Sequence, residues 1–182
     1  MKDRVKRAPA QARERARPSP KEAVAEPQAS EAGTRLSVRA ARPADIEAVT
    51  AIDAAATGLP KPAHWLELYQ RQGASVAARV IFLVATPAEQ SDRVLGFIVG
   101  EIRAWEFGSA PCGWVYALSV DPGARLRGVA ETLLAAIAAE FRKAGMTKMR
   151  TMVAREDRLP MMFFRSEGMM AGPYIQLEKD LE

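Results

Sequence analysis

The sequence predicts an α/β domain with a mixed sheet over residues 36–182, behind an N-terminal tail formed by residues 1–35. Stretches of alternating or continuous apolar residues, typical of strands, are interspersed with stretches of helical apolar spacing. The strands expected at 78–87 and 94–107 are joined by a short turn, which predicts an antiparallel hairpin. Between 114 and 155 a strand, a helix and a strand follow one another, which predicts a parallel βα crossover.

The tail at residues 1–35 carries the net charge of the whole chain. It contains nine Lys and Arg against five Asp and Glu, whereas residues 36–182 contain seventeen of each. Ala, Pro, Arg and Glu dominate it, and few large apolar residues are present to offset the entropy lost on ordering. We therefore expect a disordered basic tail. A basic arm can attract nucleic acid, but no aromatic residues are interleaved to stack on bases, so we expect no nucleic-acid partner.

The composition also indicates where the protein resides and which kinds of site it can form. No apolar stretch approaches the roughly 18 residues that span a bilayer, and the N-terminus lacks an apolar signal segment. We expect a cytoplasmic protein without a membrane partner. Cys112 is the only cysteine and His64 the only histidine, which excludes a disulfide within the chain and a multi-histidine metal site. No metal is expected.

The first half of the domain predicts a strand, two helices and the hairpin. The stretch at 36–41 alternates as a strand does, and a helix follows, with Pro43 at its first position and Asp45 in its first turn. A second short helix is expected at 63–73, ending near a glycine.

The second half predicts the crossover and a closing strand. A loop at 108–113 leads into the strand expected at 114–122, and then a helix is expected from about 128 to 144. The remaining expected elements are a strand at 147–155, a short helix at 158–168 and a last alternating strand at 173–181.

The turn before the long helix has the pattern Arg-x-x-Gly-x-Ala, within ARLRGVAETLLAAI at 124–137. Gly128 has no side chain and Ala130 a small one, so a ligand can approach the backbone closely. The start of the helix offers unpaired N–H groups and the positive end of its dipole, which together favour a pyrophosphate. Arg125 and Arg127 could add charge at the rim. On these residues alone, a plain turn with a solvated basic rim explains the pattern equally well.

The surroundings of this turn carry a family resemblance. Arg-x-x-Gly-x-Ala, preceded by LSVDP and followed by ETLLAAI, resembles the signature of the GNAT superfamily of acyl-CoA-dependent N-acetyltransferases. The order of elements is similar, and the resemblance covers roughly residues 36–182. It implies a GNAT-like central sheet and direct transfer of an acetyl group from acetyl-CoA to an amine, with no metal.

The resemblance also implies where the coenzyme binds. Residues 118–120 (Leu118, Ser119 and Val120) would pair with the pantetheine arm, and the amides of Leu118 and Val120 would polarise the thioester carbonyl. Backbone N–H groups would cradle the pyrophosphate, from six consecutive residues: Arg125, Leu126, Arg127, Gly128, Val129 and Ala130.

The acid–base residues depart from the family pattern. Phe164 stands where the family often has a tyrosine that protonates the departing thiolate, and Asp157 stands where it often has an asparagine. Phenylalanine cannot donate a proton, so the general acid is left open. Losing a general acid lowers the rate by about 10²–10⁴-fold without abolishing the chemistry.

Two residues are candidates for catalysis. Glu101 shares a strand face with Phe97 and Val99 and could deprotonate the amine through a water, or it could be an ordinary surface carboxylate. Tyr116 lies four residues before Val120 and could orient the acceptor or exchange a proton, or it could be a core aromatic.

His64 and Trp65 lie in the segment that borders the acceptor in the resembled family, so we expect them to contact the substrate. Residues 54–73 contain few acidic residues, which gives no strong indication of the amine; we favour a small-molecule amine slightly over a protein lysine or N-terminus. The alternative is a catalytically weak acyl-CoA-binding sensor or regulatory module, suggested by Phe164. Homodimers are common in the resembled family, and the sequence leaves the oligomeric state of this protein open.

Overall fold

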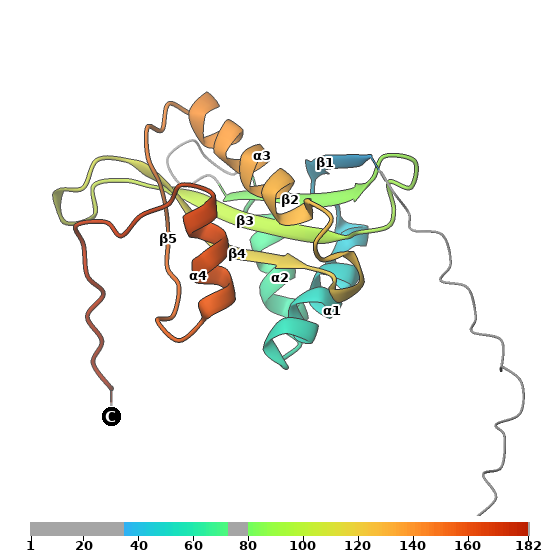
Figure 1. The fold of residues 1–182 in the computed structure, drawn as a ribbon, viewed down its shortest axis with the longest axis horizontal. Helices are drawn as coiled ribbons and strands as arrows, with labels where there is room; N and C mark the ends of the chain where they lie inside the picture. Colours follow the sequence, from blue (N-terminus) through green and yellow to red (C-terminus); the bar gives the residue numbers. More distant parts are fainter. Residues whose placement is uncertain (1–34, 73–79, 182) are drawn as a thin grey trace, which may run out of the picture. The chain divides into compact units, whose positions relative to one another are not determined.

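The computed structural model describes residues 35–72 and 80–181, so the predicted tail lies outside the described residues except for Arg35. A five-stranded sheet with the order β1-β2-β3-β4-β5 forms the centre of the domain (Figure 1). Its strands are β1 (Leu36–Ala40), β2 (Val80–Pro87), β3 (Gly96–Arg103), β4 (Cys112–Val120) and β5 (Met149–Thr151). All neighbours are antiparallel except β4 and β5, which are parallel, so the predicted mixed sheet is confirmed.

Helices cover both faces of the sheet (Figure 1). On one face lie α1 (Ile46–Thr57) and α2 (Pro62–Gln70), and on the other lie α3 (Val129–Lys143) and α4 (Arg158–Ser166). Short 3-10 turns stand at Pro43–Asp45, Glu106–Gly108 and Pro122–Ala124. No helix in the described part of the chain is long and apolar enough to cross a membrane.

Each face of the sheet has its own apolar core, because side chains alternate between the faces along a strand. Phe97 on β3 points towards α1 and α2 and is fully buried there with Phe82. Its neighbour Ile98 points the other way, against Ile137 and Phe141 of α3. The buried residues of α3 recur at helical spacing, which is why this stretch forms an amphipathic helix on the sheet.

Glycines let α3 approach the sheet closely. A Cβ at Gly100 would lie 2.9 Å from Cζ of Phe141, and a Cβ at Gly113 would overlap the ring of the same phenylalanine. The Phe141 ring is buried and fills the space that these two positions leave open. The distance between α3 and the middle of the sheet therefore depends on the absence of side chains at both.

An ion pair fixes the connection from β1 to α1. Both terminal nitrogens of Arg39 donate to Asp45, Nη1 to Oδ2 at 2.6 Å and Nη2 to Oδ1 at 2.8 Å, and the backbone N–H of Arg42 donates to Oδ2 at 2.7 Å. Asp45 is only 4% exposed. Burial by itself would raise the pKa of Asp45, but these hydrogen bonds hold it below its ordinary value.

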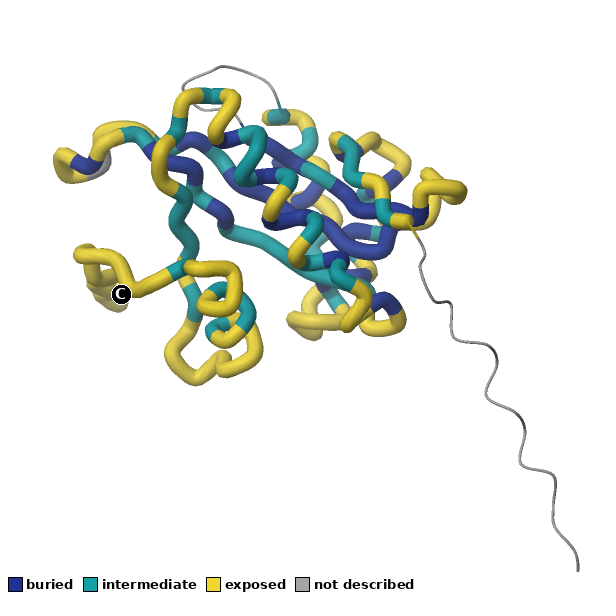
Figure 2. The backbone as a smooth tube through the Cα atoms, turned by 45° about the horizontal axis from the view of Figure 1, so that its top comes forward, coloured by how far each residue is buried: buried dark blue, intermediate teal, exposed yellow. Residues whose placement is uncertain are grey.

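Three predicted strands differ from the observed structure. The strand expected at 94–107 leaves the sheet after Arg103, and Trp105 and Phe107 adopt left-handed backbone conformations with φ of 61° and 45°. The strand expected at 147–155 is only three residues long. The prediction of a last strand at 173–181 is wrong, because this segment is extended and exposed but joins no ladder among the described residues (Figure 2). Alternation specifies the two faces of a strand but supplies no partner.

Candidate functional site

The sheet opens between β4 and β5. Parallel pairing joins only Gly113, Trp114 and Val115 of β4 to the three residues of β5, whereas β4 itself continues to Val120. Among the described residues no strand pairs with that edge of β4 from Tyr116 onwards. An unpaired strand edge presents backbone N–H and C=O groups, so an extended ligand can bind here as an additional strand would.

A β-bulge lies where the two strands part. Gly100 of β3 pairs with Val115 and Val99 pairs with Ala117, which leaves Tyr116 as an extra residue on β4. Bulges bend a strand and re-aim its side chains, and they are frequent beside active sites. The bulge was not predicted, because residues 114–118 are all apolar or aromatic, so a shift in the alternation between the two faces leaves no mark in the sequence.

The turn after β4 leads directly into α3. Asp121 accepts a hydrogen bond from the N–H of Gly123 at 2.7 Å, and Ala124 is buried beneath the turn. Leu126 and Gly128 are both left-handed, with φ of 62° and 74°. Because successive amides change direction along such a backbone, they can converge on an anion.

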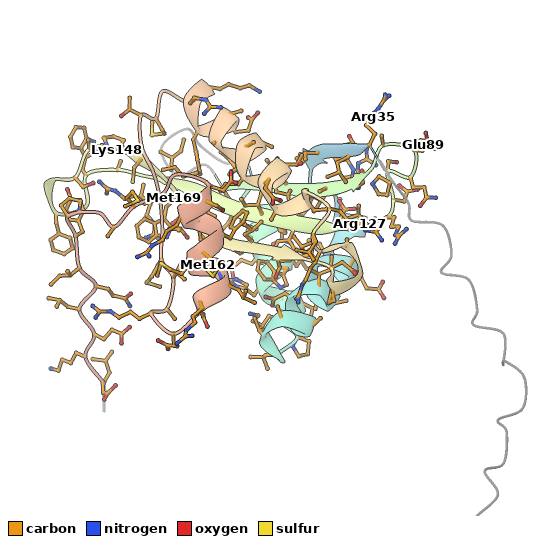
Figure 3. The ribbon with its side chains drawn as sticks, viewed as in Figure 1. Arg35, Glu89, Arg127, Lys148, Met162 and Met169 are labelled. Carbon is orange, nitrogen blue, oxygen red and sulfur yellow. The ribbon has the colours of Figure 1, made fainter. Side chains whose placement is uncertain are left out.

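The same turn has room for a ligand. Nothing lies within 4 Å of the position that a Cβ of Gly128 would occupy. α3 begins at the next residue, so its first N–H groups and the positive end of its dipole face this space. Arg127 lies at the end of the sheet where α3 begins (Figure 3). Residues 125–130 can therefore offer several backbone N–H groups to an anionic ligand.

Tyr116, the bulged residue, has a buried hydroxyl with no hydrogen-bond partner among the described residues. Burial, followed by the nearby charge of Glu101, raises its pKa from the ordinary 10.0 to about 12. The phenol consequently keeps its proton at neutral pH and can act there as a hydrogen-bond donor.

Glu101 lies on β3, on the same face of the sheet as Tyr116, so the structure brings the two catalytic candidates to one site. One oxygen of Glu101 accepts a hydrogen bond from Nε of Arg103 at 2.7 Å, and the other lies 3.7 Å from Nη2 of Arg71. The guanidinium of Arg103 in turn stacks over the ring of Trp114 at 4.5 Å.

The two arginines were not predicted as site residues. Strand alternation could have found Arg103, because it lies two residues from Glu101 and shares its face. No sequence pattern indicates Arg71, which follows the end of α2 and reaches Glu101 only through the packing of α2 on the sheet.

Of the two expected substrate contacts, the structure leaves only His64 at the surface. Trp65 is 2% exposed, and its ring packs edge-on against Phe97 at a centroid distance of 4.9 Å. This burial leaves Trp65 little surface for a substrate, and contact between Trp65 and a substrate stays a prediction. His64 is exposed, with its ring 4.9 Å from that of Trp65.

Phe164 on α4 is a packing residue. It is half-buried against the core beneath α3, and its ring lies 5.2 Å from the ring of Phe163. Asp157 is exposed and precedes the first turn of α4. Neither residue supplies a buried proton donor.

Solved structures of similar fold include several acetyltransferases. Aminoglycoside N-acetyltransferase AAC(6')-Iy in complex with CoA is 17% identical, with a TM-score of 0.68 over 84% of this chain and 99% of that one. The aminoglycoside acetyltransferase meta-AAC0020 from an uncultured soil metagenomic sample, in complex with sisomicin, is 15% identical, with a TM-score of 0.63 over 81% and 97%. A transcriptional regulator from Bacillus halodurans C-125 is 13% identical, with a TM-score of 0.66 over 81% and 100%.

At such low sequence identities, the TM-scores show that the chain shares the fold of these proteins. No curated protein sequence matches the chain. The sequence does match the acetyltransferase (GNAT) family over residues 46–164, from the start of α1 to the last turn of α4. That match covers more than half of the chain and includes the open edge of β4 and the turn before α3, and the protein therefore belongs to the GNAT acetyltransferase family.

Proposed function

We propose that the protein transfers an acetyl group from acetyl-CoA directly to an amine, with a small-molecule amine favoured over a protein lysine or N-terminus. One observation carries this proposal: the open edge of β4 is followed, after the single 3-10 turn at Pro122–Ala124, by the turn at 125–130. A single ligand with an extended arm and a diphosphate fits both features at once.

Acetyl-CoA supplies the acetyl group as a thioester. Leu118, Ser119 and Val120 bind its extended arm through their backbone, and residues 125–130 bind its diphosphate through N–H groups. The amides of Leu118 and Val120 stabilise the negative charge that develops on the carbonyl oxygen during attack. The side chains of Arg125 and Arg127 are exposed and add positive charge at the rim.

The acceptor approaches on the face of the sheet that carries Tyr116 and Glu101, the two candidates for proton transfer. Tyr116 donates a hydrogen bond to the reacting groups, which its high pKa permits at neutral pH. Glu101 takes the proton of the amine through a water, and His64 lines the entrance. No residue at the family's tyrosine position protonates the thiolate, because Phe164 occupies it.

A second candidate function is an acyl-CoA-binding module of low catalytic rate. The observation that favours it is Phe164, which packs in the core where the family often has a proton donor. In this case acetyl-CoA would bind at the same residues, and amines would release little thiol.

Two substitutions at one position test the coenzyme site. Gly128→Asp places a negative charge at the turn, and Gly128→Asn is its matched control, because both side chains have the same size and tolerate a left-handed backbone better than most. We expect calorimetry to show at least about tenfold weaker acetyl-CoA binding for Asp than for Asn, since an added anion repels the diphosphate. Equal affinities would show that the diphosphate binds elsewhere.

Activity is tested separately by following free thiol while the wild-type protein is incubated with acetyl-CoA and a panel of amines. Thiol release that depends on an amine supports the acetyltransferase. Tight acetyl-CoA binding without such release from any amine of the panel supports the binding module.

A further inference from the structure

A cluster of charged side chains lies beside Tyr116 on the face of the sheet that α1 and α2 cover. It consists of Arg71 after α2 and of Glu101 and Arg103 on β3, so among the described residues two guanidinium groups accompany a single carboxylate. All three charges are close enough to change the pKa of Tyr116. Glu101 raises that pKa, and both arginines lower it.

The two arginines differ in how closely they contact Glu101. Arg103 is held in place from two sides, by its hydrogen bond to Glu101 and by its stacking on Trp114. Arg71 is 3.7 Å from the nearest carboxylate oxygen, which is longer than a hydrogen bond, and its side chain is 49% exposed. Arg71 thus adds positive charge to the cluster and presents donors towards solvent.

This charge pattern selects among amines. An acceptor with several positive charges meets two guanidinium groups and one carboxylate, which is an unfavourable balance. An acceptor with an ammonium group and one anionic group satisfies both signs, the ammonium near Glu101 and the anion at Arg71. Guanidinium binds carboxylate and phosphate with paired, charge-assisted hydrogen bonds.

We propose that the acceptor is a small amine that also carries one carboxylate or phosphate group, and that Arg71 binds this anionic group while Glu101 faces the amine. This inference rests on the proposed function and names the substrate class of the same site. The acceptor approaches β4 past this cluster because the bulge, Tyr116 and the cluster share one face of the sheet.

The test compares amines that differ only in the second group. β-Alanine is paired with its amide, phosphoethanolamine is paired with ethanolamine, and 1,3-diaminopropane is the dication. With acetyl-CoA as donor, we expect kcat/KM to be at least about tenfold higher for an anionic amine than for its neutral partner. The β-alanine and phosphoethanolamine arms distinguish a carboxylate from a phosphate.

Variants then assign the preference to one residue. Arg71→Gln is expected to lower the ratio of kcat/KM between anionic and neutral amines by about tenfold, and Arg71→Glu to shift the preference towards 1,3-diaminopropane. The control is Arg142→Gln, an exposed arginine at the far end of α3, which is expected to leave the ratio at its wild-type value. Because the same pair of amines is compared in wild type and variant at one pH, differences in the basicity of the amines cancel.

The outcomes separate this inference from the proposed function. If neutral or dicationic amines are acetylated as well as anionic ones, or if Arg71→Gln leaves the ratio unchanged, the inference is overturned while the acetyltransferase stands. If no amine releases thiol, the acetyltransferase fails, and the anionic amines are titrated calorimetrically into the protein with CoA present. Binding that Arg71→Gln abolishes then supports the anion site, and the absence of binding overturns it.

Discussion

Among single residues, Tyr116 shows how burial changes the acid–base behaviour of a side chain. Its hydroxyl is buried at the bulge without a partner among the described residues, and its pKa is raised to about 12. A phenol in this state holds its proton far above neutral pH, so it is suited to donating a hydrogen bond and unsuited to serving as a base.

Titration of the three tyrosines tests this reading of Tyr116. We expect tyrosinate absorbance to show one step at about 12 that disappears in Tyr116→Phe and persists in the exposed control Tyr174→Phe. Because the folded pKa lies above the ordinary value of 10.0, the stability of the protein should fall as pH rises from 10 towards 12, and less so in Tyr116→Phe. An unchanged titration in Tyr116→Phe would contradict the burial of the hydroxyl.

Among the secondary-structure elements, α3 packs closely on the sheet because Gly100 and Gly113 have no side chains beneath it. Gly113→Ala adds a methyl group where the ring of Phe141 lies, and we expect it to lower the free energy of unfolding by about 1–3 kcal/mol. Urea denaturation measures the effect. Gly172→Ala is the matched control, since open space surrounds that position and it should change stability little.

A second substitution checks the cause. Phe141→Leu makes room beside Gly113, so the double variant should lose less stability than the two single losses added together. Strict additivity would show that Phe141 is not what the new methyl group meets.

The sequence predicted some elements well and others poorly, for physical reasons. α3 and β4 were predicted within two residues at each end, because each has a strong period and a clear turn beside it. The segment at 173–181 has the alternation of a strand, but a strand forms only beside another strand, and the sequence does not name that neighbour. The guanidinium of Arg150 over the ring of Tyr174, at 4.7 Å, is the contact that the start of this segment makes with β5.

At the scale of the whole molecule, the candidate site was predictable where one continuous segment builds it. The open edge of β4 and the turn at 125–130 follow each other in sequence, so one continuous motif and its family resemblance predict both. The cluster around Glu101 joins α2, β3 and β4, and only the packing of distant segments brings Arg71 to it. For the same reason the burial of Trp65 could not be foreseen from its place at the start of a helix.

The stability of the whole fold should depend on the ion pair between Arg39 and Asp45. We expect Asp45→Asn to lower the free energy of unfolding by about 3 kcal/mol at neutral pH, because it leaves Arg39 without its charged partner. The pKa of Asp45 is lowered in the folded protein, so the stabilisation is present above its ordinary pKa and is lost as pH falls below that value. Wild type and variant should therefore converge in strongly acidic solution.

Denaturation across pH measures this prediction. Glu89→Gln is the control, since Glu89 is exposed in the connection between β2 and β3, at the same end of the sheet as Arg35 (Figure 3). A loss in Asp45→Asn no larger than in this control would show that the pair contributes little.

The bulge gives β4 one residue more than its pairing with β3 can use. Removing Tyr116 from the chain would join Val115 to Ala117, and the ladder would run unbroken from Gly96 to Arg103. Val115 and Leu118 already belong to one core, and Ala117 to the other, so the shortened strand would keep each of them on its present side. We therefore expect the sheet to fold without this residue, and the deletion would show whether β4 opens beside β5 because of the bulge.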